Sequence, residues 1–261
     1  MIKINNLGYD VAGKWLVQEV NYTFHPGKIY MICGPNGAGK STLLRLLSLQ
    51  LNLTAGEVYY NQEKVNHNHA ARYATSRAVL SQHVDISFPL SAEEVIMMGR
   101  YPHFDIRPTQ KDISIRDAII ENLSLEKFRR RNYLTLSGGE KQRVQFARVL
   151  AQIWEEPVAG SRILLLDEPI SSLDLKNQLE FLHEVKKFTS PNTIVIAILH
   201  DLNLALNYAD ELLLMSKGRL YTFGKPGDVL NPAHIAEVFG VQSSLHHLPG
   251  AEFLWPDKLP A

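Results

Sequence analysis

The clearest chemical feature of this sequence is a glycine-rich segment between two apolar stretches. It matches the pattern G-x-x-x-x-G-K-[S/T] and consists of Gly34, Pro35, Asn36, Gly37, Ala38, Gly39, Lys40, Ser41 and Thr42. Glycines here let backbone N–H groups wrap a phosphate, and Lys40 can reach the β and γ oxygens of a nucleotide. Ser41 supplies a hydroxyl for Mg²⁺. The segment predicts a phosphate site rather than an empty glycine-rich turn.

Two further apolar tracts end in residues that can do acid–base chemistry. The first ends in Asp167 and Glu168, and the second ends in His200 and Asp201. Consecutive strand residues point to opposite sides, so the two acids can have different tasks. Asp167 suits Mg²⁺ through water, and Glu168 suits an attacking water. Ligands of α/β sheets bind beyond the carboxyl ends of strands, which aims His200 at the same crevice. Surface polarity for the acids and an N-cap role for Asp201 are the alternatives.

A second glycine-rich segment opens a predicted helix at Ser137, Gly138, Gly139 and Glu140. A capping box explains Ser137 as N-cap and Glu140 as its partner. It does not explain the glycines, since each costs about 1 kcal/mol in a helix relative to alanine. Exposed N–H groups at a helix start form an anion site, and the chain already has one phosphate segment. We therefore expect this second site to serve a nucleotide held by another copy.

Strands and helices alternate around these segments, as they do in α/β proteins with a parallel sheet. Apolar or alternating stretches predict strands at Met1–Leu7, Trp15–Phe24, Lys28–Cys33, Glu57–Tyr60, Ala78–Ser81, Ile163–Leu166, Thr193–Leu199, Glu211–Met215 and Arg219–Phe223. Helical periodicity predicts helices at Lys40–Leu51, Asp174–Phe188 and Asn231–Phe239. The first two strands are expected to pair in an antiparallel patch.

The chain is expected to form one domain with three parts. Residues 1–82 and 153–240 would form the core with its antiparallel patch, residues 83–152 an inserted helical subdomain, and residues 241–261 a C-terminal tail. Helical periodicity dominates after residue 83, interrupted by prolines and a glycine. The predicted fold class is α/β, with a mainly parallel sheet, an N-terminal antiparallel β patch and an inserted helical subdomain.

Composition limits the partners and the compartment. Basic and acidic residues number 27 each, so the formal net charge is zero and no nucleic-acid partner is expected. The single cysteine, Cys33, excludes an intramolecular disulfide, as is usual in a reducing compartment. The longest apolar run, Ile194–Leu199, is far shorter than the roughly 20 residues that span a bilayer, and the opening residues lack a signal peptide's apolar region. We expect a chain that does not cross a membrane by itself.

Six segments together resemble the ATP-binding subunits of ATP-binding cassette (ABC) transporters. They are GPNGAGKST at 34–42, Gln82 after a strand, LSGGEKQ at 136–142, ILLLDEP at 163–169, Ser171-Ser172-Leu173-Asp174, and His200. The resemblance covers about residues 1–240. It implies a P-loop NTPase core that binds ATP and Mg²⁺. It also implies a head-to-tail homodimer, in which each ATP lies between the Walker A loop of one copy and the signature loop of the other.

The resemblance also implies metal and catalytic roles for individual residues. Ser41, Asp167 and Gln82 would hold Mg²⁺, and Gln82 would also sense the membrane partner. Lys40 would bind the phosphates, and Glu168 would act as the general base.

Three further roles follow from the same resemblance. His200 would contact the γ-phosphate. The signature residues 137–140 would contact the ATP of the other copy, and Asp174 would link the two sites across the dimer.

Three positions depart from the family pattern. Glu140 replaces the commonest signature glutamine, and Ile170 replaces a usual threonine. Val11 stands where an aromatic residue usually stacks on adenine. Tyr9, two residues away on the same predicted strand face, is the expected substitute, although it can equally be a packed tyrosine.

Three other stretches are similar to importers of iron chelates, cobalamin and haem, namely FPLSAEEV at 88–95, MGRYPH at 98–103 and HDLNLA at 200–205. RVLAQIW at 148–154, with a longer linker to Ile163, most resembles haem (hemin) importer ATPases. The implied partners are integral membrane permease subunits, which would contact residues 88–104, and indirectly a substrate-binding protein. The implied location is the cytoplasmic face of the inner membrane, as a peripheral subunit.

Other functions remain open at this point. A ferric-siderophore or cobalamin importer would use the same motor. A soluble ABC ATPase that moves no cargo usually carries two cassettes or long coiled-coil inserts, and this chain has neither. A P-loop kinase of a small metabolite explains residues 34–42 but not the LSGGE segment.

Overall fold

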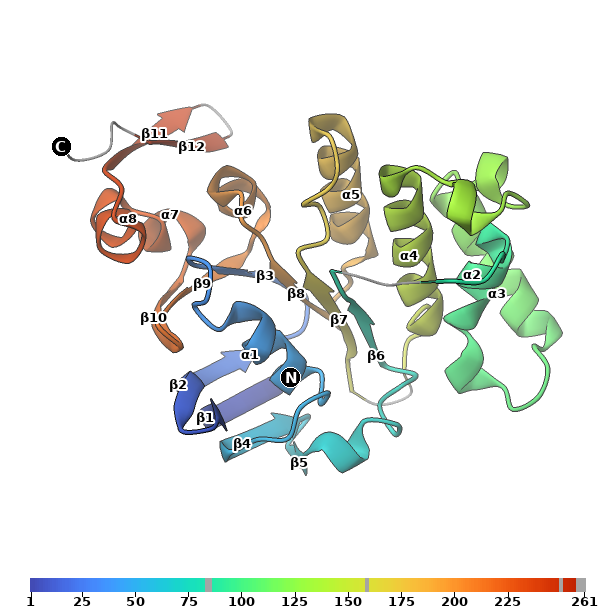
Figure 1. Cartoon of the computed structure of the whole chain (residues 1–261), viewed down its shortest axis with the longest axis horizontal. Helices are drawn as coiled ribbons and strands as arrows, with labels where there is room; N and C mark the ends of the chain where they lie inside the picture. Colours follow the sequence, from blue (N-terminus) through green and yellow to red (C-terminus); the bar gives the residue numbers. More distant parts are fainter. Residues whose placement is uncertain (83–85, 158–159, 249–250, 257–261) are drawn as a thin grey trace.

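A six-stranded sheet forms the centre of the computed structural model, which describes residues 1–82, 86–157, 160–248 and 251–256 (Figure 1). Its strands, in the order β10-β9-β3-β8-β7-β6, are β10 (Arg219–Gly224), β9 (Glu211–Ser216), β3 (Lys28–Cys33), β8 (Thr193–Ile198), β7 (Arg162–Asp167) and β6 (Arg77–Leu80). All neighbours are parallel except β10, which is antiparallel to β9. The expected mainly parallel sheet is confirmed. Strands β7 and β8 are buried at every position, which explains their apolar runs.

A four-stranded antiparallel sheet lies beside the central sheet and confirms the expected N-terminal patch. Its order is β2-β1-β4-β5, with β1 (Ile2–Val11), β2 (Lys14–Phe24), β4 (Ala55–Tyr60) and β5 (Glu63–Val65). Helix α1 (Lys40–Leu47) packs between the two sheets, because its buried leucines share one apolar cluster with residues of β1, β2, β3 and β8. This packing holds the start of α1 at the carboxyl end of β3.

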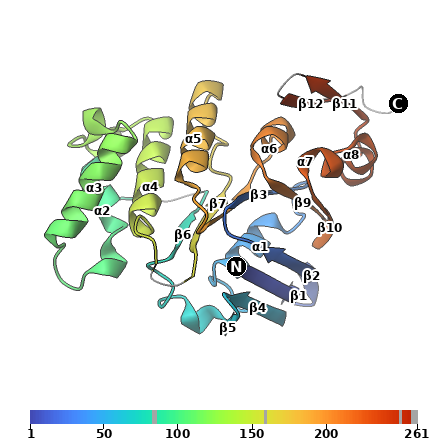
Figure 2. The ribbon, with the colours of Figure 1, turned by 180° about the vertical axis from the view of Figure 1, so that it is seen from behind.

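Three helices form a group beyond β6, on the side of the molecule away from the small sheet (Figures 1 and 2). They are α2 (Ala92–Met98), α3 (Gln110–Asn122) and α4 (Gly138–Gln152), and each begins with a capping box. The buried Arg100 guanidinium connects them. Its nitrogen atoms lie 3.0 Å from Asp112 Oδ1, 2.9 Å from the Ala151 carbonyl oxygen and 2.7 Å from Glu155 Oε2.

The remaining helices contribute buried residues to the apolar cluster on the face of the central sheet opposite α1. They are α5 (Leu175–Phe188), α6 (Leu202–Tyr208), α7 (Pro226–Val229) and α8 (Pro232–Phe239), and 3₁₀ turns occur at His67–His69, Tyr101–His103, Glu126–Phe128 and Tyr133–Thr135. Among the described residues, no helix is both long enough and apolar enough to cross a membrane.

Two predictions from the sequence differ from the structure. The predicted helix Lys40–Leu51 ends at Leu47, because Leu49 adopts a positive φ of 59° that breaks the helix. Residues 241–261, for which no element is predicted, contain an antiparallel hairpin of β11 (Ser243–Leu248) and β12 (Ala251–Pro256). The hairpin packs on α6 and α8.

Candidate active site

The glycine-rich loop after β3 is held in place by close backbone contacts. Gly34 has a φ of 147°, and a Cβ atom added there would lie 2.2 Å from the Met215 carbonyl oxygen. Gly39 has a φ of 95°, and its Cβ would lie 2.4 Å from the Leu16 carbonyl oxygen. Both contacts are far shorter than side-chain atoms allow, so both positions require glycine.

The turn between β9 and β10 also supports this loop. Gly218 donates its N–H to the Ala38 carbonyl oxygen at 3.1 Å and accepts a hydrogen bond from the Gln18 N–H at 2.8 Å. Leu16, on β2, lines the cavity of about 220 Å³ formed by residues 36–42 and Glu168. Sequence reasoning missed Leu16 and Gly218. The one available signal for Leu16 was its place in the predicted strand Trp15–Phe24, where neighbouring residues point to opposite faces. An apolar residue next to the core residue Val17 therefore lies on the other face of the strand.

Lys40 points back into the loop at the first turn of α1. Its ammonium group donates to the carbonyl oxygens of Gly34 at 2.7 Å and Pro35 at 2.9 Å. The side chain is buried, and burial lowers the pKa of Lys40, while Cys33, Glu168 and Asp167 oppose the shift. A cation held out of water in this way gains from an anion brought to the loop.

Ser41 and Asp167 meet beside the loop. The Ser41 hydroxyl lies 3.0 Å from Asp167 Oδ1. Burial raises the pKa of Asp167, which is 6% exposed, and the hydrogen bond from Ser41 and two nearby cations only partly offset this. A hydroxyl and a carboxylate are the hard oxygen donors that Mg²⁺ prefers, so these residues fit the metal that the sequence predicts.

Glu168 lies between Gln82 and His200, although the three residues come from distant parts of the chain. Gln82 Nε2 donates to Glu168 Oε2 at 2.8 Å, and His200 Nε2 lies 2.6 Å from Glu168 Oε1. Glu168 has a positive φ of 51°, which is rare for a residue with a side chain. Its carboxylate lines both the cavity at the glycine-rich loop and a neighbouring cavity that contains His200. Three of the predicted catalytic residues, Glu168, His200 and Gln82, are therefore brought together, and Gln82 contacts Glu168 rather than Ser41 or Asp167.

The second glycine-rich segment lies at the exposed start of α4. The capping box forms as expected, with the Ser137 N–H donating to Glu140 Oε2 at 2.8 Å and the Glu140 N–H donating to Ser137 Oγ at 3.3 Å. A Cβ on Gly138 would meet no atom within 4 Å. Among the described residues, none of the segment 137–140 lines the cavity formed by residues 36–42 and Glu168.

Two other predicted site residues also lie outside that cavity. Asp174 is exposed and caps α5 by accepting a hydrogen bond from the Asn177 N–H at 2.9 Å. Tyr9 is half-buried and packs against the apolar cluster between the two sheets.

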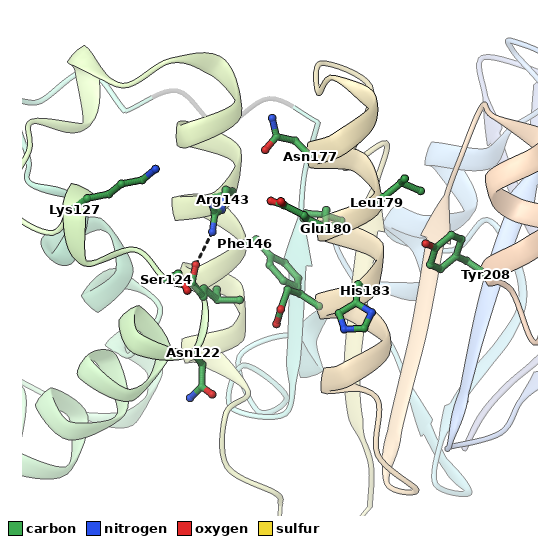
Figure 3. Close-up of a pocket in the computed structure, with 13 residues that line it drawn as sticks. Asn122, Ser124, Lys127, Arg143, Phe146, Asn177, Leu179, Glu180, His183 and Tyr208 are labelled. Atoms are coloured by element: carbon green, nitrogen blue, oxygen red, sulfur yellow. Dashed lines mark hydrogen bonds between the residues drawn. The ribbon is translucent and has the colours of Figure 1, made fainter.

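A larger cavity of about 630 Å³ lies between α4 and α5 (Figure 3). Arg143 and Phe146 line it from α4, and Glu180 and His183 line it from α5. The Phe146 and Phe181 rings pack with their centroids 4.4 Å apart. No residue that the sequence predicts for nucleotide chemistry lines this cavity, so size alone does not mark the reactive site.

The chain belongs to the ABC transporter family, whose model matches residues 17–171. It is an ATP-hydrolysing subunit of this transporter class. It is 42% identical to the hemin import ATP-binding protein HmuV of Rhodopseudomonas palustris (strain ATCC BAA-98 / CGA009), over 98% of this chain and 94% of that protein. It is also 42% identical to the protein of the same name from Gloeobacter violaceus (strain ATCC 29082 / PCC 7421), over 95% and 90% of the two chains.

Solved structures agree with this assignment. A metal-chelate type ABC transporter in an inward-facing conformation matches with a TM-score of 0.81 and 25% identity, over 98% of this chain and 97% of that one. A nucleotide-free ATP-binding cassette from an ABC transporter matches with a TM-score of 0.77 at 20% identity, over 92% and 95% of the two chains, and supports the fold alone. The P-loop NTPase core and the resemblance seen in the sequence are confirmed.

Proposed function

We propose that this chain is the ATP-hydrolysing motor subunit of a haem importer. The observation that supports the motor best is the position of Glu168, which faces the glycine-rich loop and contacts both Gln82 and His200. Support for haem comes from relatives called hemin import ATP-binding proteins, which match nearly the whole chain.

Each group at the loop has a task in this proposal. Residues 34–42 hold the phosphates of ATP through their backbone N–H groups, which only Pro35 lacks, and through the Lys40 ammonium. Ser41 and Asp167 would hold Mg²⁺, with Gln82 as a further ligand, and the bound ion would neutralise charge on the phosphate oxygens. Glu168 accepts a proton from the attacking water.

His200 and the nucleotide base complete the proposed site. His200 contacts the γ-phosphate, and for that contact it turns from Glu168 toward the loop. Leu16 gives the loop cavity an apolar wall, and stacking of Tyr9 on adenine stays a prediction.

We also propose that two copies form a head-to-tail dimer around two ATP molecules. The open start of α4 supports this, because a Cβ on Gly138 would meet no atom within 4 Å, and no residue of the segment 137–140 lines the cavity at residues 36–42 of its own chain. The N–H groups of Gly138 and Gly139 can then bind the phosphates of a partner's ATP. Asp174, exposed at the start of α5, links the two sites. ATP binding closes the dimer, and hydrolysis reopens it.

The membrane partners follow from the transporter class. Permease subunits would contact residues 88–104, where Phe88 and Tyr101 are exposed. We place the chain at the cytoplasmic face of the inner membrane as a peripheral subunit, with residues 83–152, of which 86–152 are described, as its helical subdomain. A substrate-binding protein acts indirectly through the permease.

A Glu168→Gln variant tests the motor. We expect ATP hydrolysis to fall roughly 100-fold or more, because general base catalysis is lost, while ATP binding persists and a dimer accumulates. Glu180→Gln, at an exposed position of α5, is the matched control and should keep wild-type hydrolysis. Wild-type hydrolysis by Glu168→Gln would disprove the assignment of the base.

Growth tests the cargo. A strain that lacks this gene is grown on haem, on a ferric siderophore or on inorganic iron as the sole iron source, with complementation by wild type or Lys40→Ala. Loss of growth on haem alone, restored only by wild type, supports haem import. Loss of growth on a siderophore with haem use intact would favour the second candidate, an importer of a metal chelate. The match to a metal-chelate type transporter supports this second candidate.

A further inference from the structure

The C-terminal hairpin is attached to α6 by an unusual set of hydrogen bonds. Asn203 donates from Nδ2 to the Leu254 carbonyl oxygen at 3.3 Å and accepts from the Leu254 N–H at 2.7 Å. Asn207, one turn later, makes the same pair of bonds to Glu252, at 2.9 and 3.2 Å. Two side-chain amides on one helix face therefore pair with β12 as a neighbouring strand would.

Apolar packing adds to this attachment. Leu254 is 5% exposed and belongs to the main apolar cluster, together with Leu204 and Ala205 of α6. On β12, side chains alternate between the two faces, so Phe253 and Trp255 point away from α6 and are exposed. The hairpin is thus bound to α6 through the edge of β12 that does not pair with β11, and through the Leu254 side chain.

Helix α6 in turn follows directly from His200. Asp201 caps the helix, since its Oδ1 accepts hydrogen bonds from the N–H groups of Asn203 at 2.9 Å and Leu204 at 3.0 Å. The helix has only seven residues, and helices this short are not stable without tertiary contacts. His200 therefore sits between a rigid strand, β8, and a short helix whose position depends on its neighbours.

We propose that the β11–β12 hairpin is a brace that positions His200 through α6. Asn203 and Asn207 are the positioning residues, because their four bonds fix the first two turns of the helix against β12. The kinetic part of this inference rests on the proposed role of His200 at the γ-phosphate. The alternative is that the hairpin only covers apolar surface and contributes to stability alone.

The test uses the full chain with Asn203→Ala and Asn207→Ala combined. We expect kcat for ATP to fall roughly tenfold with little change in KM, since a displaced group lowers the rate without removing the phosphate loop. In a His200→Ala background the same two substitutions should cause no further loss. Trp255→Ser, on the outer face of the same strand, is the matched control and should leave kcat unchanged. Asn207→Ala alone, at an exposed position, provides a milder variant if the double variant folds poorly.

Histidine NMR separates the brace from the role of His200. The His200 ring signal, assigned with His200→Gln, should shift or broaden in the Asn variants, whereas the signal of His183 on α5 should not. An unchanged His200 signal with a lowered melting temperature would overturn the brace and leave a structural hairpin. If His200→Ala hydrolyses ATP normally, the proposed role of His200 fails, and the His200 signal still decides whether the brace exists.

Discussion

The two glycine-rich helix starts of this chain differ in what their glycines are for. At the phosphate loop, Gly34 and Gly39 have positive φ angles and lie against carbonyl oxygens of the same chain. At the start of α4, Gly138 faces open space, and the Cβ of Gly139 would meet only Leu173 Cδ2, at an ordinary 3.4 Å. The fold itself requires the first pair. Among the described residues, no contact requires glycine at the second pair, which agrees with the proposed binding of a partner's ATP there.

Charge follows the same division. Lys40 of the phosphate loop and Asp167 beside it are both buried, and burial lowers the pKa of Lys40 and raises the pKa of Asp167, so it favours the neutral form of each. At the start of α4, Glu140 is bound by the Ser137 N–H, which lowers the pKa of this carboxyl. Keeping these charges buried without a ligand therefore lowers the stability of the fold at the phosphate loop, whereas the charge at the start of α4 is already hydrogen-bonded within the chain.

Gly39→Ala should have the largest effect on the fold. An alanine at this φ costs about 1–2 kcal/mol, and overpacking against the Leu16 carbonyl adds about 1–3 kcal/mol to the loss of unfolding free energy. ATP binding should be lost as well. Gly13→Ala is the control, because Gly13 has a φ of 81° and no atom within 4 Å of its Cβ, so it carries the φ cost alone. Equal losses in urea denaturation would show that the contact at Gly39 does not matter.

Gly138→Ala should have the opposite profile. Alanine in a helix is favoured over glycine by about 1 kcal/mol, so the free energy of unfolding should stay or rise. Hydrolysis should fall roughly 100-fold, because the added Cβ obstructs N–H groups that bind a partner's ATP. The affinity of the isolated subunit for a fluorescent ATP analogue should not change. Normal hydrolysis by this variant would mean that the second segment is only a helix start.

Much of this comparison was predictable from the sequence, because it depends on local patterns. Strand β3 has the predicted bounds, Lys28–Cys33, and the phosphate loop follows it as expected. The capping box of Ser137 and Glu140 was also readable, since its residues are three apart. Apolar periodicity and cap spacing act within a few residues, so a single sequence contains them.

The rest depends on contacts between distant segments. The Gln18 N–H reaches Gly218, and Gln82 reaches Glu168, across stretches for which no spacing rule exists. The positive φ of Glu168 has no signal in its residue type, because glutamate rarely adopts it. The C-terminal hairpin was missed for a similar reason, since its attachment uses amide side chains of α6 together with Leu254, and this combination leaves no periodic apolar pattern in the sequence.

Asp167→Asn tests whether the buried charge beside the phosphate loop destabilises the fold. Burial raises the folded-state pKa of Asp167 above its unfolded value, so the folded state binds the extra proton and wild-type stability falls as pH rises through that folded pKa. The neutral Asn amide can still form a hydrogen bond with Ser41, and because it does not ionise, the variant does not lose stability as the pH rises. We expect a melting temperature a few degrees above wild type near pH 8, a smaller gap near pH 4, and loss of Mg²⁺-dependent hydrolysis. A gap that grows toward acid would contradict the assigned direction of the shift.

Two substitutions of Ser137 give the smallest expected change in stability and separate the cap from the anion site. Ser137→Ala removes the cap and should cost about 1 kcal/mol of unfolding free energy, whereas Ser137→Asp keeps a good N-cap and should cost little. For hydrolysis the order reverses, because an aspartate places negative charge where a partner's phosphate would bind, and alanine does not. Melting curves and ATPase rates of the two variants, measured together, check this reversal. If hydrolysis followed stability in both variants, the start of α4 would act only through its fold, and the difference between the two glycine-rich segments would lie in packing alone.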